Sequence, residues 1–288
     1  MLDELTKTSA KKYINRGRSI LAAAIICLLT AQGIAQHASH GAIAKSETIK
    51  TNMASTPLRA FAGEPVTIGN GNARSWVAVD KEGKPTSVGV TFTEAALSGL
   101  PQRLTPGLIW TEFILSLPPS APRLPFDHIG LNWNPRGHDP EGVYNVPHFD
   151  FHFYMISPSE REKITTRGDD LARCRKPLAE EFTPAGYVYA PASEEPGMGS
   201  HWVEPGSHEF HGAAFTHTFI YGSYDGRMIF LEPMIAKSFL ETRPNVTAEI
   251  KLPMKYQKSG YYPTRYTINY DAQAKEYTVA LEGLTFRQ

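Results

Sequence analysis

The sequence Pro147-His148-Phe149-Asp150-Phe151-His152-Phe153-Tyr154 alternates aromatic and polar side chains over the length of a β-strand. Successive side chains of a strand point to opposite faces, so the three phenylalanines share one face and the polar residues share the other. The phenylalanine face is expected to pack on a hydrophobic core. The opposite face carries residues about 7 Å apart along the strand, namely His148, Asp150, His152 and Tyr154.

Two imidazoles and a carboxylate on one face suit a divalent transition metal such as Zn, Fe, Mn or Cu. His148 and His152 are therefore predicted metal ligands. They do not complete a ligand set on their own, so further ligands must come from other segments. The alternative is a solvent-facing polar strand on which Asp150 merely pairs with a histidine.

Two residues elsewhere are predicted to complete the ligand set. His201 follows a glycine-rich loop that can turn inward, and Asp225-Gly226 is typical of a two-residue hairpin turn. In the register that this turn predicts, His217 faces Met234 and Glu232 lies diagonal to His217 on the same face. A carboxylate on an apolar face is costly unless it is paired or bound to a cation. Glu232 is thus predicted to be a metal ligand or the buried partner of His217.

Period-two patterns also dominate the rest of the chain and predict a mainly β fold, an antiparallel barrel or sandwich. A short helical insertion is expected near residues 157–182, because Ser157-Pro158-Ser159-Glu160 has the pattern of a capped helix start. The strand candidates are 75–79, 87–92, 108–117, 128–134, 147–156, 186–190, 215–223, 227–232, 247–252, 262–269 and 277–281.

Composition excludes several classes of protein. The chain has 288 residues, of which 41% are hydrophobic, and its 29 Lys and Arg balance 29 Asp and Glu. No basic footprint for nucleic acid is therefore present. The motifs of serine hydrolases, nucleotide-binding loops and zinc proteases are missing as well.

The amino terminus has the layout of a secretory signal peptide, with basic residues before an apolar run and Gly33-Ile34-Ala35 after it. Residues 1–35 are predicted to be this signal, 36–60 a flexible leader and 61–288 a single β-rich domain. The protein is therefore expected to be exported to the periplasm or the exterior, with no stable membrane span after cleavage. Cys174 would be the remaining thiol, and beside Arg173 and Arg175 it is expected to be partly exposed and unable to form an intramolecular disulfide.

The chain resembles a bacterial family of secreted β-rich proteins of unknown function. The resemblance is carried by Gly137-His138-Asp139-Pro140, the Pro147–Tyr154 motif, Gly199-Ser200-His201-Trp202 and the segment from Tyr224 to Met234. It covers most of residues 61–240 and implies export and a mainly β domain. The positions that match the motif of the family are His138, His148, Asp150, His152, His201 and Glu232.

Two classes of function follow. In a metal-dependent enzyme the ion would be held by His148, His152, His201 and Glu232. Asp150 would then orient an imidazole or accept a proton, while Tyr154 or His138 assists proton transfer. In the alternative, a non-catalytic β-domain binds a small molecule or assembles with copies of itself, and the histidines are structural. An open coordination position distinguishes a catalytic metal site from a structural one.

Overall fold

The computed structural model describes residues 59–104 and 109–288. The predicted signal peptide and nearly all of the predicted leader lie outside these residues. The first described strand, β1 (Arg59–Ala62), begins close to the predicted start of the folded domain at residue 61. None of the helices that the structure describes is long and apolar enough to cross a membrane.

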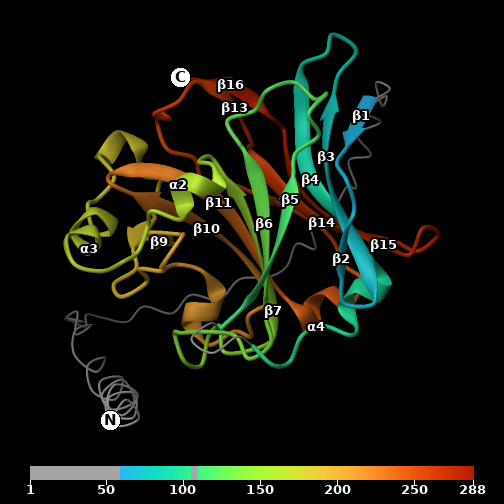
Figure 1. Ribbon diagram of the computed structural model, residues 1–288, viewed down its shortest axis with the longest axis horizontal. Helices are drawn as coiled ribbons and strands as arrows, with labels where there is room; N and C mark the ends of the chain where they lie inside the picture. Colours follow the sequence, from blue (N-terminus) through green and yellow to red (C-terminus); the bar gives the residue numbers. More distant parts are fainter. Residues whose placement is uncertain (1–58, 105–108) are drawn as a thin grey trace, which may run out of the picture. The chain divides into compact units, whose positions relative to one another are not determined.

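The first large sheet, sheet 1, joins strands from both ends of the described chain (Figure 1). Val90 pairs with Val279, so the predicted hairpin of β3 and β4 is continued by a strand that lies almost 200 positions later. The order is β1 (Arg59–Ala62), β3 (Gly71–Val79), β4 (Pro85–Thr93), β15 (Glu276–Glu282), β14 (Arg265–Asp271) and β12 (Asn245–Glu249), with β2 (Val66–Ile68) paired to β3.

The second large sheet, sheet 2, contains the motif strand in an interior position between β6 and β11. Its order is β5 (Thr111–Ser116), β6 (His128–Asn134), β7 (His148–Tyr154), β11 (Arg227–Ala236), β10 (His217–Tyr224), β9 (Ser200–Val203) and β8 (Val188–Tyr189). A small third sheet pairs β13 (Gly260–Tyr262) with β16 (Thr285–Arg287). The prediction of a mainly β, antiparallel fold is confirmed, and in residues 59–104 and 109–288 no sheet closes into a barrel.

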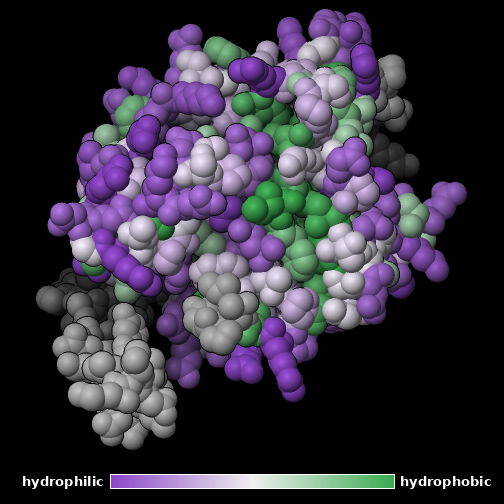
Figure 2. Space-filling view, viewed as in Figure 1, coloured by the Kyte–Doolittle hydropathy of each residue, from purple (hydrophilic) through white to green (hydrophobic). Residues whose placement is uncertain are grey.

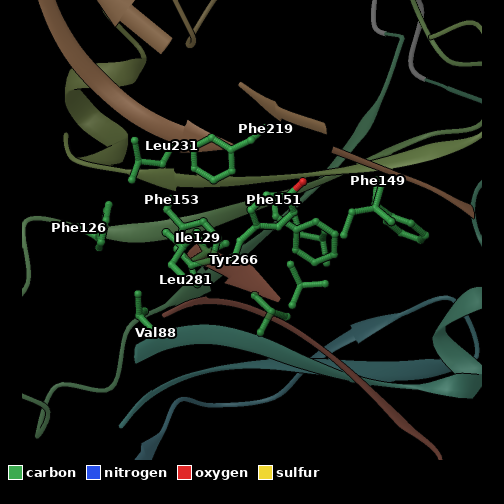
Figure 3. Packing of buried hydrophobic residues seen from close by; sticks show 14 of the residues in the cluster. Val88, Phe126, Ile129, Phe149, Phe151, Phe153, Phe219, Leu231, Tyr266 and Leu281 are labelled. Atoms are coloured by element: carbon green, nitrogen blue, oxygen red, sulfur yellow. The ribbon is translucent and has the colours of Figure 1, made fainter. Parts of the chain in front are cut away.

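The main hydrophobic cluster takes side chains from both large sheets. The Phe92 ring of β4 lies 6.4 Å from the Phe149 ring and 6.0 Å from the Phe151 ring of β7, measured between centroids. Figure 3 shows Phe151 and Phe153 among the clustered side chains, with Val88 of sheet 1 across from them. The phenylalanine face of the motif therefore packs on the core, as the sequence pattern predicts.

The helical insertion follows β7. Ser157 accepts a hydrogen bond from the Glu160 backbone N–H, and Glu160 accepts one from the Ser157 N–H, so the predicted capping box is present. In Figure 2 the surface over α2 and α3 is mostly hydrophilic. The short helices are α2 (Pro158–Arg161), α3 (Asp169–Cys174), α4 (Lys237–Leu240) and the 3-10 turns η1 (Glu94–Leu97), η2 (Glu180–Phe182) and η3 (His208–His211).

The hairpin of β10 and β11 has the predicted turn. Tyr224 pairs with Arg227 across Asp225-Gly226, and both turn residues have positive φ angles, 52° and 72°. Positive φ at both positions is the geometry of the turn that joins two-residue hairpins. A β-bulge between Gly222 and Ser223 then shifts the pairing by one residue.

This bulge makes the predicted placement of Glu232 beside His217 wrong. Glu232 pairs with Ile220 instead of Phe219, and a shift of one residue moves side chains to the opposite face of the sheet. His217 consequently faces sheet 1, where its Nδ1 lies 2.7 Å from the Tyr266 hydroxyl. Glu232 lies on the outer face of sheet 2, the same face as the polar side of β7.

We predict that Phe151→Ala lowers the free energy of unfolding by about 3–5 kcal/mol, because it leaves a cavity where a fully buried ring packs between the sheets. Phe286→Ala is the matched control, since that ring is 56% exposed and its loss should cost within about 0.5 kcal/mol. Denaturant unfolding of both variants measures the difference. Equal losses would contradict the assignment of Phe151 to the core.

Candidate metal centre

The polar face of β7 is buried, not exposed to solvent. His148, Asp150 and His152 are 0%, 4% and 1% exposed. The strand lies inside sheet 2, and two smaller apolar clusters on the outer face, one around Tyr154 and one around Met234, border the polar residues. The solvent-facing alternative is therefore wrong for this strand.

One set of candidate ligands, which we call group 1, consists of His138, His148 and Asp150. His148 Nε2 lies 3.1 Å from Asp150 Oδ1, and His138 Nε2 lies 4.0 Å from Asp150 Oδ2. The loop that carries His138 is held by a hydrogen bond from its backbone N–H to the Tyr144 carbonyl. Asn134 donates its Nδ2–H to Asp150 Oδ2 at 2.7 Å and orients the carboxylate.

The second set, group 2, consists of His152, His201 and Glu232. The register of β7 and β11 places Glu232 across from His152, with 3.4 Å between His152 Nε2 and Glu232 Oε1. His201 Nε2, which β9 brings from the other side, lies 4.0 Å from Glu232 Oε2. The Phe230 ring contacts both imidazoles, at 4.9 Å and 5.4 Å between ring centroids.

Backbone carbonyls orient three of these four imidazoles. Nδ1 lies 2.7 Å from a carbonyl oxygen in His138, His148 and His201, the partners being Asp139, Val146 and Ser193. In a neutral ring Nδ1 then carries the proton, and Nε2 is left as an acceptor. Each of these Nε2 atoms faces a carboxylate, which is also an acceptor. A cation between the two satisfies both, and a carbonyl behind Nδ1 is the usual second partner of a metal-binding histidine.

The fourth imidazole, His152, is held by stacking. Neither of its ring nitrogens has a hydrogen-bond partner among the described residues. Its ring stacks on the Tyr154 ring at 5.3 Å between centroids, with 13° between the planes. Its nitrogens are therefore available to a ligand or an ion.

The electrostatics of the two groups differ. Burial lowers the pKa of His152 to about 3 and the pKa of His201 to about 4. Burial and the nearby Asp150 charge raise the pKa of Glu232 well above its usual range. In group 1 burial opposes charge, but the attraction between His148 and Asp150 outweighs it, so the pKa of His148 is raised and the pKa of Asp150 is lowered. Without a cation, group 1 is an ion pair and group 2 is uncharged.

The structure distributes the predicted site residues differently from the sequence analysis. The four residues assigned to one ion are divided, with His148 in group 1 and the others in group 2. His138 and Asp150, which were assigned to proton transfer and imidazole orientation, stand in group 1 as possible ligands. The Tyr154 hydroxyl is buried without a partner in the described residues, and burial raises its pKa well above 10.

Sequence reasoning missed two asparagines of β6. Asn134 orients Asp150, and Asn132 is fully buried on the same face of the sheet. A signal was present, because residues 128–134 alternate polar or small residues with apolar ones just as the motif strand does. Two strands that each carry polar residues at alternate positions could have pointed to a polar layer shared by both strands.

These features define a mainly β protein with two buried His/carboxylate groups that could hold metal ions. Residues 80–133 match the family model TTHB210-like, which is described as hypothetical protein TTHB210. The match supports a likeness to a bacterial family of uncharacterised proteins. It includes Asn132 but none of the six candidate ligands. Neither the curated proteins nor the solved structures contain a match.

Cys174 is buried at 1% exposure, so its predicted partial exposure is wrong. The thiol packs in the apolar cluster around Tyr154. Burial, followed by the nearby carboxylates, raises its pKa to about 11. The flanking arginines do not offset this burial.

We predict that Cys174 reacts with iodoacetamide at pH 8 at least about 100-fold more slowly in the folded protein than in urea, because the thiolate is the reactive form. Between pH 7 and 10 the folded rate should rise about tenfold per pH unit, while the unfolded rate levels off above about pH 8.5. Peptide mass spectrometry separates Cys174 from Cys27. Equal folded and unfolded rates would show that the thiol is exposed.

Proposed function

We propose that this protein binds divalent transition-metal ions at group 1 and group 2, and that it is a metal-dependent enzyme. The observation that carries this proposal is the arrangement of four imidazoles whose Nε2 atoms lie within 4.0 Å of buried carboxylate oxygens. Backbone carbonyls fix three of the rings in this orientation. A bound cation would take the place of the protons that satisfy these contacts in the metal-free protein, on His148 in group 1 and on Glu232 in group 2.

The donor set indicates the class of ion. Imidazole with carboxylate suits Zn, Fe, Mn or Cu, whereas Mg and Ca prefer oxygen ligands alone. Each group supplies three residues, and a tetrahedral ion with three protein ligands keeps one position for water or substrate. An ion with an open position can activate water or polarise a carbonyl group, and this supports an enzyme.

One contact favours a structural role for part of the centre. His148 and Asp150 are only 3.1 Å apart, which is the separation of an ordinary ion pair. The second candidate function is therefore a non-catalytic β-domain in which group 1 is an ion pair and only group 2 binds an ion. In either case we propose an exported protein, on the basis of the signal-like pattern of residues 1–35.

We predict that purified protein loaded with zinc and then desalted retains two zinc ions per chain, measured by plasma mass spectrometry. His148→Ala should lose one ion and His152→Ala the other, because each ring supplies a ligand with no substitute in its group. The affinity at the altered site should fall by more than about 100-fold, since even residues behind the ligands contribute 10–100-fold. Zinc should raise the melting temperature of the wild type, because it binds the folded state.

His208→Ala is the matched control, since His208 is an exposed histidine of η3 outside both groups. It should retain two ions. If the wild type and His148→Ala each retain one ion and His152→Ala retains none, group 1 is an ion pair and only group 2 binds a metal. A wild type that retains none of Zn, Mn, Fe and Cu would contradict the proposal.

A further inference from the structure

Asn132 is a buried amide without a partner. Its side chain is 0% exposed, and neither Nδ2 nor Oδ1 has a hydrogen-bond partner among the described residues. Asn134, two residues along the same face of β6, instead donates to Asp150 at 2.7 Å. Buried amides are almost always hydrogen-bonded because an unpaired one is destabilising. Nδ2 and Oδ1 of Asn132 are therefore available to a molecule from outside the chain.

The Tyr154 hydroxyl is the second unpaired group, and its ring is held rigidly. The Arg161 guanidinium lies 3.8 Å from the ring centroid, while His128 and His152 stack on the ring at 5.0 Å and 5.3 Å. Arg161 is itself fixed by an ion pair with Glu112, with 2.6 Å between Nη2 and Oε1. The hydroxyl is fully buried and has no partner among the described residues.

Both unpaired groups are neighbours of His152 in group 2. The register of β6 and β7 pairs His152 with Gly130 and Asp150 with Asn132. Asn132 is therefore diagonal to His152, and Tyr154 lies two residues beyond it on the same face. Gly130 leaves room for the Glu112 carboxylate and the Tyr154 ring, since a Cβ there would lie 2.7 Å from Glu112 Oε1 and 2.9 Å from Tyr154 Cε2.

The chemistry of these groups indicates an uncharged ligand. Arg161, the cation over the Tyr154 ring, is already paired with Glu112, so the positive charge beside the ligand would come from the ion of group 2, where Glu232 offsets part of it. An asparagine amide offers a donor and an acceptor side by side, and its complement is another group with an acceptor beside a donor. A primary carboxamide has that pattern, whereas a carboxylate has no donor.

We propose that Asn132 and Tyr154 bind a small uncharged carboxamide next to the ion of group 2. The amide N–H donates to Asn132 Oδ1, and the amide oxygen accepts from the Tyr154 hydroxyl or Asn132 Nδ2 while it faces the ion. This inference rests on the proposed function for the ion and adds the class of ligand. The ligand would supply the hydrogen-bond partners that Asn132 and the Tyr154 hydroxyl lack among the described residues.

Stability tests this inference without any ligand. Asn132→Leu keeps the shape of the side chain and removes no hydrogen bond, so its melting temperature should equal or exceed that of the wild type by up to about 4 °C. The matched control Asn134→Leu breaks the bond to Asp150 and should lower the melting temperature by at least about 4 °C. Tyr154→Phe removes an unpaired hydroxyl and should likewise keep the melting temperature of the wild type. Its matched control is Tyr221→Phe, which should lower the melting temperature because Tyr221 donates to the Lys251 carbonyl at 2.6 Å.

Ligand binding is measured by saturation-transfer NMR with acetamide on the zinc-loaded full chain, with acetate as the comparison. Asn132→Leu and Tyr154→Phe should each lower the affinity for acetamide at least about tenfold, with unchanged zinc content. Acetate, which the ion can bind alone, should be unaffected by Asn132→Leu.

Three results would overturn the inference: no acetamide binding by wild type, equal binding by Asn132→Leu, or a loss of stability in Asn132→Leu as large as in Asn134→Leu. A wild type that retains no zinc contradicts the proposed function alone. Acetamide binding that persists without zinc and depends on Asn132 would still support this ligand site.

Discussion

The burial of Phe149, Phe151 and Phe153 against sheet 1 is the constraint on which the rest of the site depends. Because the side-chain period of a strand is two, this packing forces the intervening polar residues onto the outer face of sheet 2. A slip of one residue would bury two imidazoles and a carboxylate in the apolar core, which is prohibitively costly. The core therefore sets the register of β7, and the register sets the geometry of the site.

The outer face of sheet 2 is itself buried, and this makes the polar residues informative. Ionisable groups that leave water are destabilising unless they are paired, neutral or bound to a metal. His148 and Asp150 are paired, whereas lowered pKa values favour neutral His152 and His201. A divalent ion in each group would bind the same side chains through donor atoms that are already oriented.

Local sequence patterns predicted the elements well because the forces behind them are local. The bounds of β6 match the predicted strand at residues 128–134, and the capping box at Ser157 forms as expected. The register of the β10–β11 hairpin failed because of a bulge, whose one sequence signal is Gly222 inside a strand. A side chain there would collide with the Phe230 ring, since a Cβ would lie 2.0 Å from it.

The grouping of the six candidate ligands could not be predicted from the sequence, because it depends on which strands become neighbours. Glu232 meets His152 only because β11 pairs with β7, although about 80 positions separate them in the chain. The pairing of His138 with Asp150 depends likewise on how the loop before β7 folds back. The burial of Cys174 is also tertiary, since its charged sequence neighbours point to a surface.

The most direct test of the metal centre is a crystal of the protein soaked in zinc and measured at the zinc absorption edge. The account predicts anomalous peaks between the Nε2 atoms and the carboxylate of each group, about 2.0–2.2 Å from the nitrogen and oxygen ligands. Peaks confined to exposed histidines such as His208 and His211, or no peaks at all, would contradict it.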